Sequence, residues 1–257
     1  MGRGGDKGVR LGRPGAIVVY TPPMPERSFP DIGFQCNPFR AMTREEWISA
    51  AIIPETVRRA ITAGGHIQLL GDAGSGKTSS LLVLGDQFHK AGMRSGYEYI
   101  PRKEKSYRTN TDGLEIFLLD EAQRLSKGGF LSGNEMARLL DAAKNGVRLI
   151  LGTHEDLSPA FRSRGMSTVT VTLSTPAAEE LAGILQRRLN LFSLKPIITK
   201  FQPKAVDWLR SEFGANLRTM EYFLYDYFQA ERPEGIIAVG PLQKSLVAFK
   251  PPVVEEE

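Results

Sequence analysis

The sequence predicts an α/β fold, in which a parallel five-stranded sheet flanked by helices is followed by a small all-helical lid. Three observations support this fold class. Short apolar runs alternate with helical segments up to about residue 173, a pattern typical of a parallel sheet covered on both faces. A glycine-rich turn follows the first run and leads into a helix. After Thr175 and Pro176 the pattern becomes purely helical.

The elements follow from the apolar periodicity. Thr43 and Glu46 form a capping box at the first helix, which breaks and restarts near Pro54. The expected strands are residues 66–71, 96–100, 115–120, 147–153 and 168–173. The further expected helices are residues 77–92 and 134–146 in the body and 176–192, 203–213 and 216–231 in the lid.

This pattern divides the chain into four parts. Residues 1–32 form a flexible basic N-terminal segment rich in Gly, Pro and Arg, and residues 33–173 form the α/β body. Residues 174–231 form the helical lid, and residues 232–257 form a C-terminal tail that ends in three glutamates.

Composition limits the class of protein. Of the 257 residues, 41% are hydrophobic and 24% charged, as in ordinary globular proteins. The single cysteine excludes an internal disulfide framework, and three scattered histidines provide no metal-ligand cluster. No apolar run approaches the roughly 18 residues that span a bilayer, so we expect a cytoplasmic protein. A net charge of +4 leaves both nucleic-acid binding and an ordinary solvated surface open.

The turn after the first strand, "GDAGSGKT", matches the phosphate-binding pattern G-x-x-x-x-G-K-[ST] from Gly71 to Thr78. Its backbone N–H groups and the following helix N-terminus favour bound phosphates. Lys77 can reach the β- and γ-phosphates of a nucleotide, and the Thr78 hydroxyl can ligate Mg²⁺. The residues expected to hold the phosphates are Asp72, Ala73, Gly74, Ser75, Gly76, Lys77, Thr78 and Ser79.

Two adjacent acids end the strand "IFLLDE". Carboxylates at the C-terminal end of a parallel strand lie at the crevice where α/β sheets bind ligands. Asp120 is expected to hold Mg²⁺, and Glu121 to orient and deprotonate an attacking water. The two motifs together predict an ATPase that hydrolyses ATP to ADP and phosphate with Mg²⁺ as cofactor.

These two motifs followed by a helical lid resemble the AAA+ ATPases, a branch of the P-loop NTPases. The resemblance implies a sensor-1 residue after the fourth strand, where Thr153 is the first candidate and His154 the second. It implies an arginine finger at Arg162 or Arg164, acting on a neighbouring subunit's nucleotide, and a sensor-2 arginine at Arg218.

Further segments resemble one branch of this superfamily. These segments are "NPF", "DEAQRL", "GT", "LQRRL" and "NLRTM", and the branch contains transposon target-selection ATPases of the TniB/TnsC type and ExeA-type secretion ATPases. The resemblance places Asn37, Pro38 and Phe39 near the adenine. This chain departs from the family in two ways: the stretch between the second and third strands is short, and no long DNA-binding domain follows the lid.

The short stretch carries basic residues within "RKEKSYR". In this superfamily the region faces the central channel of a ring or spiral, so the resemblance implies duplex DNA contacts for Arg102, Lys103, Lys105 and Arg108, with Tyr107 adding contact. A solvated loop is the alternative.

Three functions stay open. The first is an ATP-dependent ring or filament on duplex DNA that recruits a partner such as a transposase. The second is an ExeA-like secretion or assembly ATPase. The third is a nucleotide-gated interaction module without DNA binding, and the intact Asp120 and Glu121 argue against a loss of hydrolysis.

Overall fold

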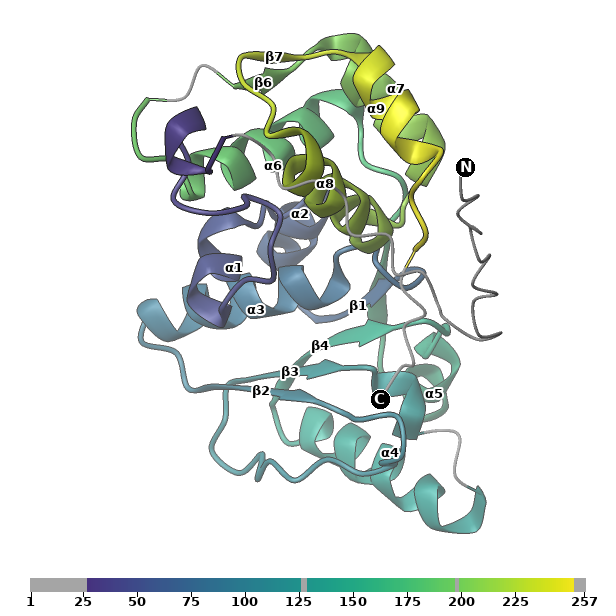
Figure 1. The fold of residues 1–257 in the computed structure, drawn as a ribbon. Helices are drawn as coiled ribbons and strands as arrows, with labels where there is room; N and C mark the ends of the chain where they lie inside the picture. Colours follow the sequence, from purple (N-terminus) through teal and green to yellow (C-terminus); the bar gives the residue numbers. More distant parts are fainter. Residues whose placement is uncertain (1–26, 126–128, 197–198, 252–257) are drawn as a thin grey trace, which may run out of the picture.

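The computed structural model describes residues 27–125, 129–196 and 199–251. Its main sheet is parallel and has five strands in the order β2-β3-β4-β1-β5, which confirms the predicted sheet (Figure 1). The strands are β1 (His66–Leu70), β2 (Ser95–Tyr99), β3 (Ile116–Asp120), β4 (Arg148–Thr153) and β5 (Thr168–Thr172). The strand order reverses beside β1, which places the turn after β1 where open α/β sheets bind ligands.

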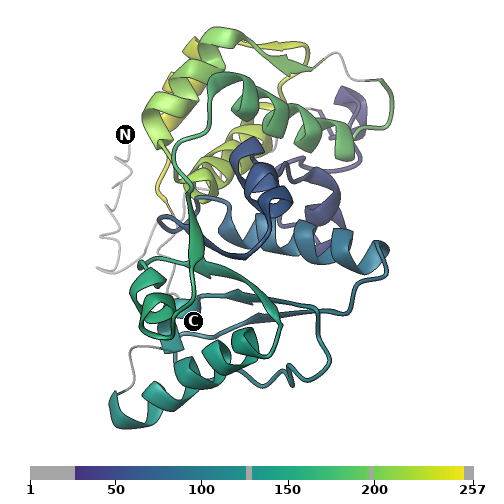
Figure 2. The ribbon, with the colours of Figure 1, turned by 180° about the vertical axis from the view of Figure 1, so that it is seen from behind.

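Helices cover both faces of this sheet, as Figures 1 and 2 show from opposite sides. The helices on one side are α1 (Arg44–Ala50), α2 (Glu55–Ala63) and α3 (Lys77–Lys90), and those on the other are α4 (Gly129–Lys144) and α5 (Ser158–Ser163). Alternate residues of the central strands enter the two cores, so Leu118 packs on the α3 side whereas Phe117 and Leu119 pack on the α4 side. The expected helix at 134–146 begins earlier, at Gly129.

The local signals at the first helices are confirmed. The Thr43 hydroxyl accepts a hydrogen bond from the Glu46 amide at 3.3 Å, and the Glu46 carboxylate accepts one from the Thr43 amide at 2.8 Å. The chain breaks at Pro54 and restarts as α2 at Glu55.

The lid has its own apolar core, built from α6 (Ala178–Leu191), α7 (Pro203–Phe213) and α8 (Leu217–Glu231). The segment before α1 joins this core, because Phe34 and Phe39 pack their rings against Phe228 on α8. The sequence predicts a body that begins at residue 33, and residues 29–39 pack with the lid core. The basic residues 1–26 lie outside the described residues.

The segment after α8 also belongs to the lid. A short strand β7 (Ile236–Ile237) pairs in parallel with β6 (Lys200–Phe201), and α9 (Val239–Leu246) buries Leu242 against the lid core. The sequence predicts a tail at 232–257, and within the described part of that range β7 and α9 pack with the lid helices. The apolar residues at this end pack against α7 and α8, contacts that a local pattern does not reveal. No helix in the described part of the chain is both long and apolar enough to cross a membrane.

The stretch between β2 and β3 contains no helix, as its length predicts. Tyr107 in this stretch is buried, with its ring 5.3 Å from that of Phe117 and the Arg138 guanidinium 3.8 Å above it. The Glu98 carboxylate accepts hydrogen bonds from the amides of Arg108 and Thr109. Tyr107 therefore fills the core beside α4, which corrects the expectation that it adds a DNA contact.

Tyr107 should stabilise the fold through its ring. We expect Tyr107→Ala to lower the free energy of unfolding by about 3–5 kcal/mol, because it leaves a cavity against Phe117, and Tyr107→Phe to change it by less than about 1 kcal/mol. Urea denaturation measures both. A similar loss for the two variants would mean that the hydroxyl, and not the ring, stabilises this loop.

Candidate functional site

The glycine-rich loop lies between β1 and α3, with backbone angles that suit a bound anion. Gly74 and Gly76 have φ values of 81° and 90°, in the left-handed region that favours glycine. Gly76 is the N-cap of α3, so the first amides of this helix point out of the loop. The Ser75 hydroxyl is buried here and has no hydrogen-bond partner among the described residues. The loop thus offers unpaired donors to an anion.

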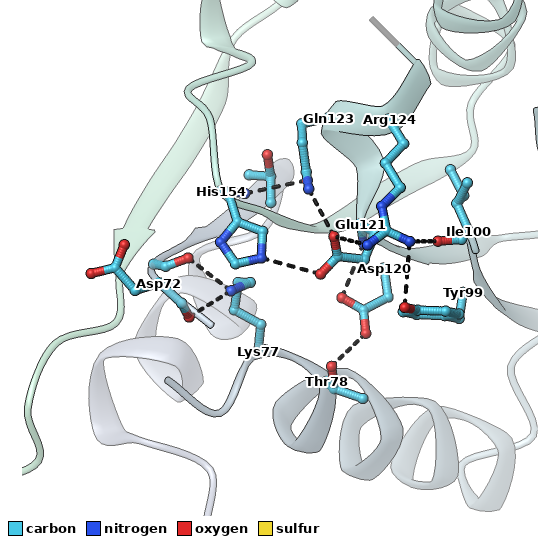
Figure 3. A network of polar contacts seen from close by, with 12 residues as sticks. Asp72, Lys77, Thr78, Tyr99, Ile100, Asp120, Glu121, Gln123, Arg124 and His154 are labelled. Carbon is cyan, nitrogen blue, oxygen red and sulfur yellow. Dashed lines mark hydrogen bonds and ion pairs between the residues drawn. The ribbon is translucent and has the colours of Figure 1, made fainter. Parts of the chain in front are cut away.

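Lys77 places its charge inside this loop. Its Nζ donates to the carbonyl oxygens of Gly71 at 2.7 Å and Asp72 at 2.9 Å (Figure 3). Burial lowers the pKa of Lys77, and the nearby Glu121 and Asp120 carboxylates act in the opposite direction. The ammonium group therefore lies against the backbone of the loop, at the point where phosphates would bind.

A hydroxyl and a carboxylate meet between α3 and β3. Thr78 Oγ1 donates to Asp120 Oδ2 at 2.6 Å, and Asp120 Oδ1 accepts a hydrogen bond from the Glu121 amide at 3.1 Å. Burial raises the pKa of Asp120, and the bond from Thr78 opposes this shift. Hydroxyl and carboxylate oxygens are the ligands that Mg²⁺ prefers, with phosphates and water completing its shell. No group of three or more acidic, His or Cys side chains with metal-binding geometry occurs in the described ranges.

Glu121 is held at the cavity wall by three side chains. Its backbone has φ 61°, which is rare for a residue with a side chain and is seen at functional sites. Its carboxylate contacts Gln123 Nε2 at 2.8 Å, Arg124 Nη2 at 2.9 Å and His154 Nε2 at 3.2 Å (Figure 3). This carboxylate is therefore fixed in direction as well as in position.

Sequence reasoning missed Arg124 and Gln123. Arg124 also donates to the Ile100 carbonyl and lies 5.5 Å from the Tyr99 ring, so it connects Glu121 to the end of β2. Its place three residues after the acid, in "DEAQRL", was the only local signal for this contact.

The two sensor-1 candidates separate in the structure. The Thr153 hydroxyl is buried and bonds within its own turn, donating to the Glu155 carbonyl at 2.7 Å and accepting from the Glu155 amide at 3.1 Å. His154 instead lines the cavity and reaches Glu121. The geometry thus favours His154, the second candidate, as the residue beside the reacting groups.

A cavity of about 1190 Å³ extends from the loop to the lid. Its middle is apolar, with Ile52, Pro54, Leu181 and Ile184 on its walls. Trp47 lines it as well and donates from Nε1 to the Ser79 hydroxyl at 2.8 Å. Loop, body and lid therefore enclose a charged end and an apolar middle, as expected of a site for a phosphorylated aromatic ligand.

The lid touches the loop directly. The Leu217 amide at the start of α8 donates to the Gly74 carbonyl at 3.2 Å, and Arg218 lines the cavity beside it. Of the "NPF" residues, Phe39 lines the cavity, whereas Asn37 and Pro38 are buried and do not. Asn37 Nδ2 donates to the Tyr225 carbonyl at 2.9 Å, so it fastens this segment to α8.

The two finger candidates lie on and just after α5. Arg162 donates to the Ser158 hydroxyl at 3.1 Å, and Arg164 pairs with Asp141 at 3.0 Å. The cavity-lining residues of the described chain do not include either arginine.

The four basic residues after β2 divide into two groups. Lys103, Lys105 and Arg108 are exposed, and Arg108 pairs with Glu104 at 2.7 Å. Arg102, although also exposed, lines the nucleotide-sized cavity near Tyr99. Lys103, Lys105 and Arg108 thus lie on the outer side of the loop, whereas Arg102 lies at the cavity.

Gln68, a buried residue of β1, fixes the turn that carries His154. Its Nε2 donates to Asp156 Oδ1 at 2.5 Å and to the Thr170 hydroxyl at 2.6 Å, and its Oε1 accepts from the Leu157 amide at 2.9 Å. Hydrogen bonds from Ser158, followed by that from Gln68, lower the pKa of Asp156 to about 2. One glutamine thus links β1, β5 and the start of α5.

Comparison with solved structures identifies the fold of this chain. No protein-family model matches the sequence. No curated protein matches it either. Among solved structures, the chain resembles AMPPCP-bound DnaA from Aquifex aeolicus with a TM-score of 0.55 and 16% identity, over 81% of this chain and 71% of that chain.

Two further structures are similar. Orc1 from Aeropyrum pernix in complex with DNA aligns with a TM-score of 0.52 and 15% identity, over 81% of this chain and 71% of that chain. A RuvB mutant from Thermotoga maritima aligns with a TM-score of 0.53 and 14% identity, over 82% and 73% of the two chains. These neighbours are AAA+ ATPases, so the chain has the AAA+ fold that the sequence motifs suggested.

Gln68 provides a test of this arrangement. Gln68→Ala should lower the free energy of unfolding by about 1–3 kcal/mol, because it leaves the buried Leu157 amide unpaired. Gln68→Glu should cost more at pH 8, where its carboxylate faces Asp156. Burial raises the folded-state pKa of such a carboxyl above its unfolded value of about 4.3, so the penalty should shrink as the pH falls from 8 to 5.

Urea denaturation at the two pH values measures these differences. Gln87→Glu, at an exposed position of α3, is the matched control and should show little change at either pH. An equal loss for Gln68→Glu at both pH values would contradict the placement of this residue beside Asp156.

Proposed function

We propose that the protein binds ATP with Mg²⁺ and hydrolyses it to ADP and phosphate. The observation that carries this proposal is the meeting of Lys77, Thr78, Asp120 and Glu121 around one loop. Phosphate binding, metal binding and water activation each need one of these side chains. The similarity to AMPPCP-bound DnaA supports an adenine nucleotide as the ligand.

Each group in the loop has a role in holding the phosphates. The backbone amides of residues 72–79 and the Ser75 hydroxyl donate to the phosphate oxygens, and Lys77 exchanges its bonds to the loop carbonyls for bonds to the β- and γ-phosphates. Thr78 and Asp120 are placed to hold Mg²⁺, which neutralises charge on these phosphates.

Glu121 is placed to orient and deprotonate the attacking water. The ion pair with Arg124 and the bond to Gln123 fix the direction of its carboxylate. We assign His154, and not Thr153, to contact the same water. Arg218 extends from α8 towards the phosphates, which ties lid position to the nucleotide.

We assign the arginine finger to a neighbouring copy of this chain. Arg162 and Arg164 lie outside their own cavity, so either can act on bound ATP only across an interface. Such sharing implies self-association into an ATP-dependent ring or filament.

The proposal predicts different effects for two substitutions. Lys77→Ala should abolish measurable ATP binding, because it removes the charge inside the loop. Glu121→Gln should keep binding but lower turnover by roughly 10²-fold or more, because the amide cannot accept the proton from water.

Tryptophan fluorescence reports the binding step. Trp47 lines the cavity, and the second tryptophan of the chain, Trp208, packs against the lid core. A Trp208→Phe background isolates Trp47, whose emission should change on ATP addition, and phosphate release measures turnover. Unchanged ATP affinity in Lys77→Ala would remove the phosphate-loop assignment, and wild-type turnover in Glu121→Gln would assign water activation to another residue.

We further propose that the oligomer acts on duplex DNA, as a target-selection regulator that recruits a partner such as a transposase. The exposed Lys103, Lys105 and Arg108 support this, and the similar Orc1 structure is a complex with DNA. Arg102 belongs less clearly to this surface, because it lines the cavity. The alternatives are a secretion or assembly ATPase and a nucleotide-gated interaction module.

Salt-dependent binding of random duplex DNA separates these functions. Changing Lys103, Lys105 and Arg108 together to Ala should reduce the slope of log affinity against log salt by about 0.9 per lost phosphate contact, while ATP binding stays intact. Lys90→Ala, an exposed residue on α3, is the control. Wild-type DNA binding by the triple variant would assign the contact elsewhere, and no DNA binding by the wild type with ATP at any salt would favour the alternatives.

A further inference from the structure

The lid end of the cavity contains a charged residue that the proposed hydrolysis does not use. Arg188 on α6 is only 4% exposed and lines the cavity together with Met42, Leu185 and Met220. Buried arginines normally satisfy their donors, since a buried unpaired donor lowers stability. The donors of Arg188 that lack a partner therefore indicate which kind of ligand group would bind at this end of the cavity.

Only one corner of the Arg188 guanidinium is used within the described chain. Nη2 donates to the Arg40 carbonyl at 2.7 Å, which fixes the plane of the group. Nε and Nη1 are buried and have no hydrogen-bond partner among the described residues. Burial lowers the pKa of Arg188, whereas the Glu221 carboxylate acts in the opposite direction. The fold thus leaves two buried donors of this group unused at a fixed position.

An acceptor lies near the corner of the guanidinium that bonds Arg40. The Glu221 carboxylate, on α8, also lines the cavity and lies 4.0 Å from Arg188 Nη2. The two side chains therefore bring a donor group and an acceptor next to each other in the wall of the cavity that the phosphate loop also lines. A planar heteroaromatic ring with the reverse pattern, an acceptor beside a donor, is complementary to this pair.

We propose that Arg188 and Glu221 recognise the adenine base of the bound nucleotide. Arg188 donates to a ring nitrogen, and Glu221 accepts from the exocyclic amino group. This inference rests on the proposed ATP binding, and it adds the residues that select the base. Guanine in the same orientation sets its carbonyl oxygen against the Glu221 carboxylate and is disfavoured.

A base-free ligand separates this role from phosphate binding. Calorimetry of the full chain with magnesium tripolyphosphate, MgATP and MgGTP should give the tightest binding for ATP in the wild type. Arg188→Met should weaken ATP binding about 10- to 100-fold, which corresponds to the loss of hydrogen bonds from a charged group, and leave tripolyphosphate binding within about 2-fold. Arg187→Met, the exposed neighbour on the same helix, should change neither affinity.

Two further variants test the chemistry. Arg188→Lys keeps the charge without the forked donors, so it should also lose most of the gain that the base provides. Glu221→Gln should reduce the preference for ATP over GTP by about 10-fold, because an amide can donate to the guanine oxygen. Thermal denaturation confirms that each variant is folded.

The outcomes distinguish this inference from the proposed function. ATP binding unchanged in Arg188→Met, an equal loss of ATP and tripolyphosphate binding, or a wild-type preference for GTP would each overturn the base assignment. Wild-type protein that binds tripolyphosphate as tightly as ATP would leave the phosphate loop in place and remove the base assignment alone. Wild-type protein that binds neither would remove both.

Discussion

The hydrogen bond between Thr78 and Asp120 is the contact on which the site depends. It joins the first turn of α3 to the end of β3, so the phosphate loop and the two acids keep one geometry. The contact needs space beside β4, and Gly152 provides it: a Cβ on that residue would lie 2.5 Å from Asp120 Oδ1 and 2.9 Å from a Leu81 methyl group. The buried Asp120 carboxylate also accepts a hydrogen bond from the amide of Glu121, the residue whose backbone has the unusual positive φ. The elements α3, β3 and β4 thus fix the positions of the Asp120 and Glu121 carboxylates, which lie in different environments.

The lid is connected to the same loop through backbone atoms. The Gly74 carbonyl accepts from the Leu217 amide, and a Cβ on Gly74 would lie 2.6 Å from Asn216 Oδ1. Glycine is therefore required at position 74 for two reasons: the left-handed φ of this residue and the close approach of α8. Since Arg218 follows directly, this one contact positions the start of α8, with Arg218, against the glycine-rich loop. The lid also holds residues 29–39 and 232–251, so both ends of the described chain share its packing.

The sequence predicted the sheet, the phosphate loop and the adjacent acids because each depends on local features: an apolar run, a glycine pattern, or an acid at a strand end. The misses depend on partners distant in sequence. Tyr107 is an aromatic residue in a basic stretch, and only its contact with Phe117 shows that it belongs to the core. Arg188 lies among helical residues with nothing local to distinguish it, and only the fold shows that two of its donors are buried without a partner among the described residues.

The shortened stretch between β2 and β3 has a structural consequence for the catalytic acid. Without a second helix, Tyr107 covers this part of the sheet and the basic side chains Lys103 and Lys105 stay on the outside. The stretch begins at the end of β2, where Arg124 bonds the Ile100 carbonyl and lies near the Tyr99 ring. The same Arg124 forms the ion pair with Glu121. One side chain therefore connects the root of the basic loop to the Glu121 carboxylate, so the position of the loop and the direction of this carboxylate are physically coupled in this fold.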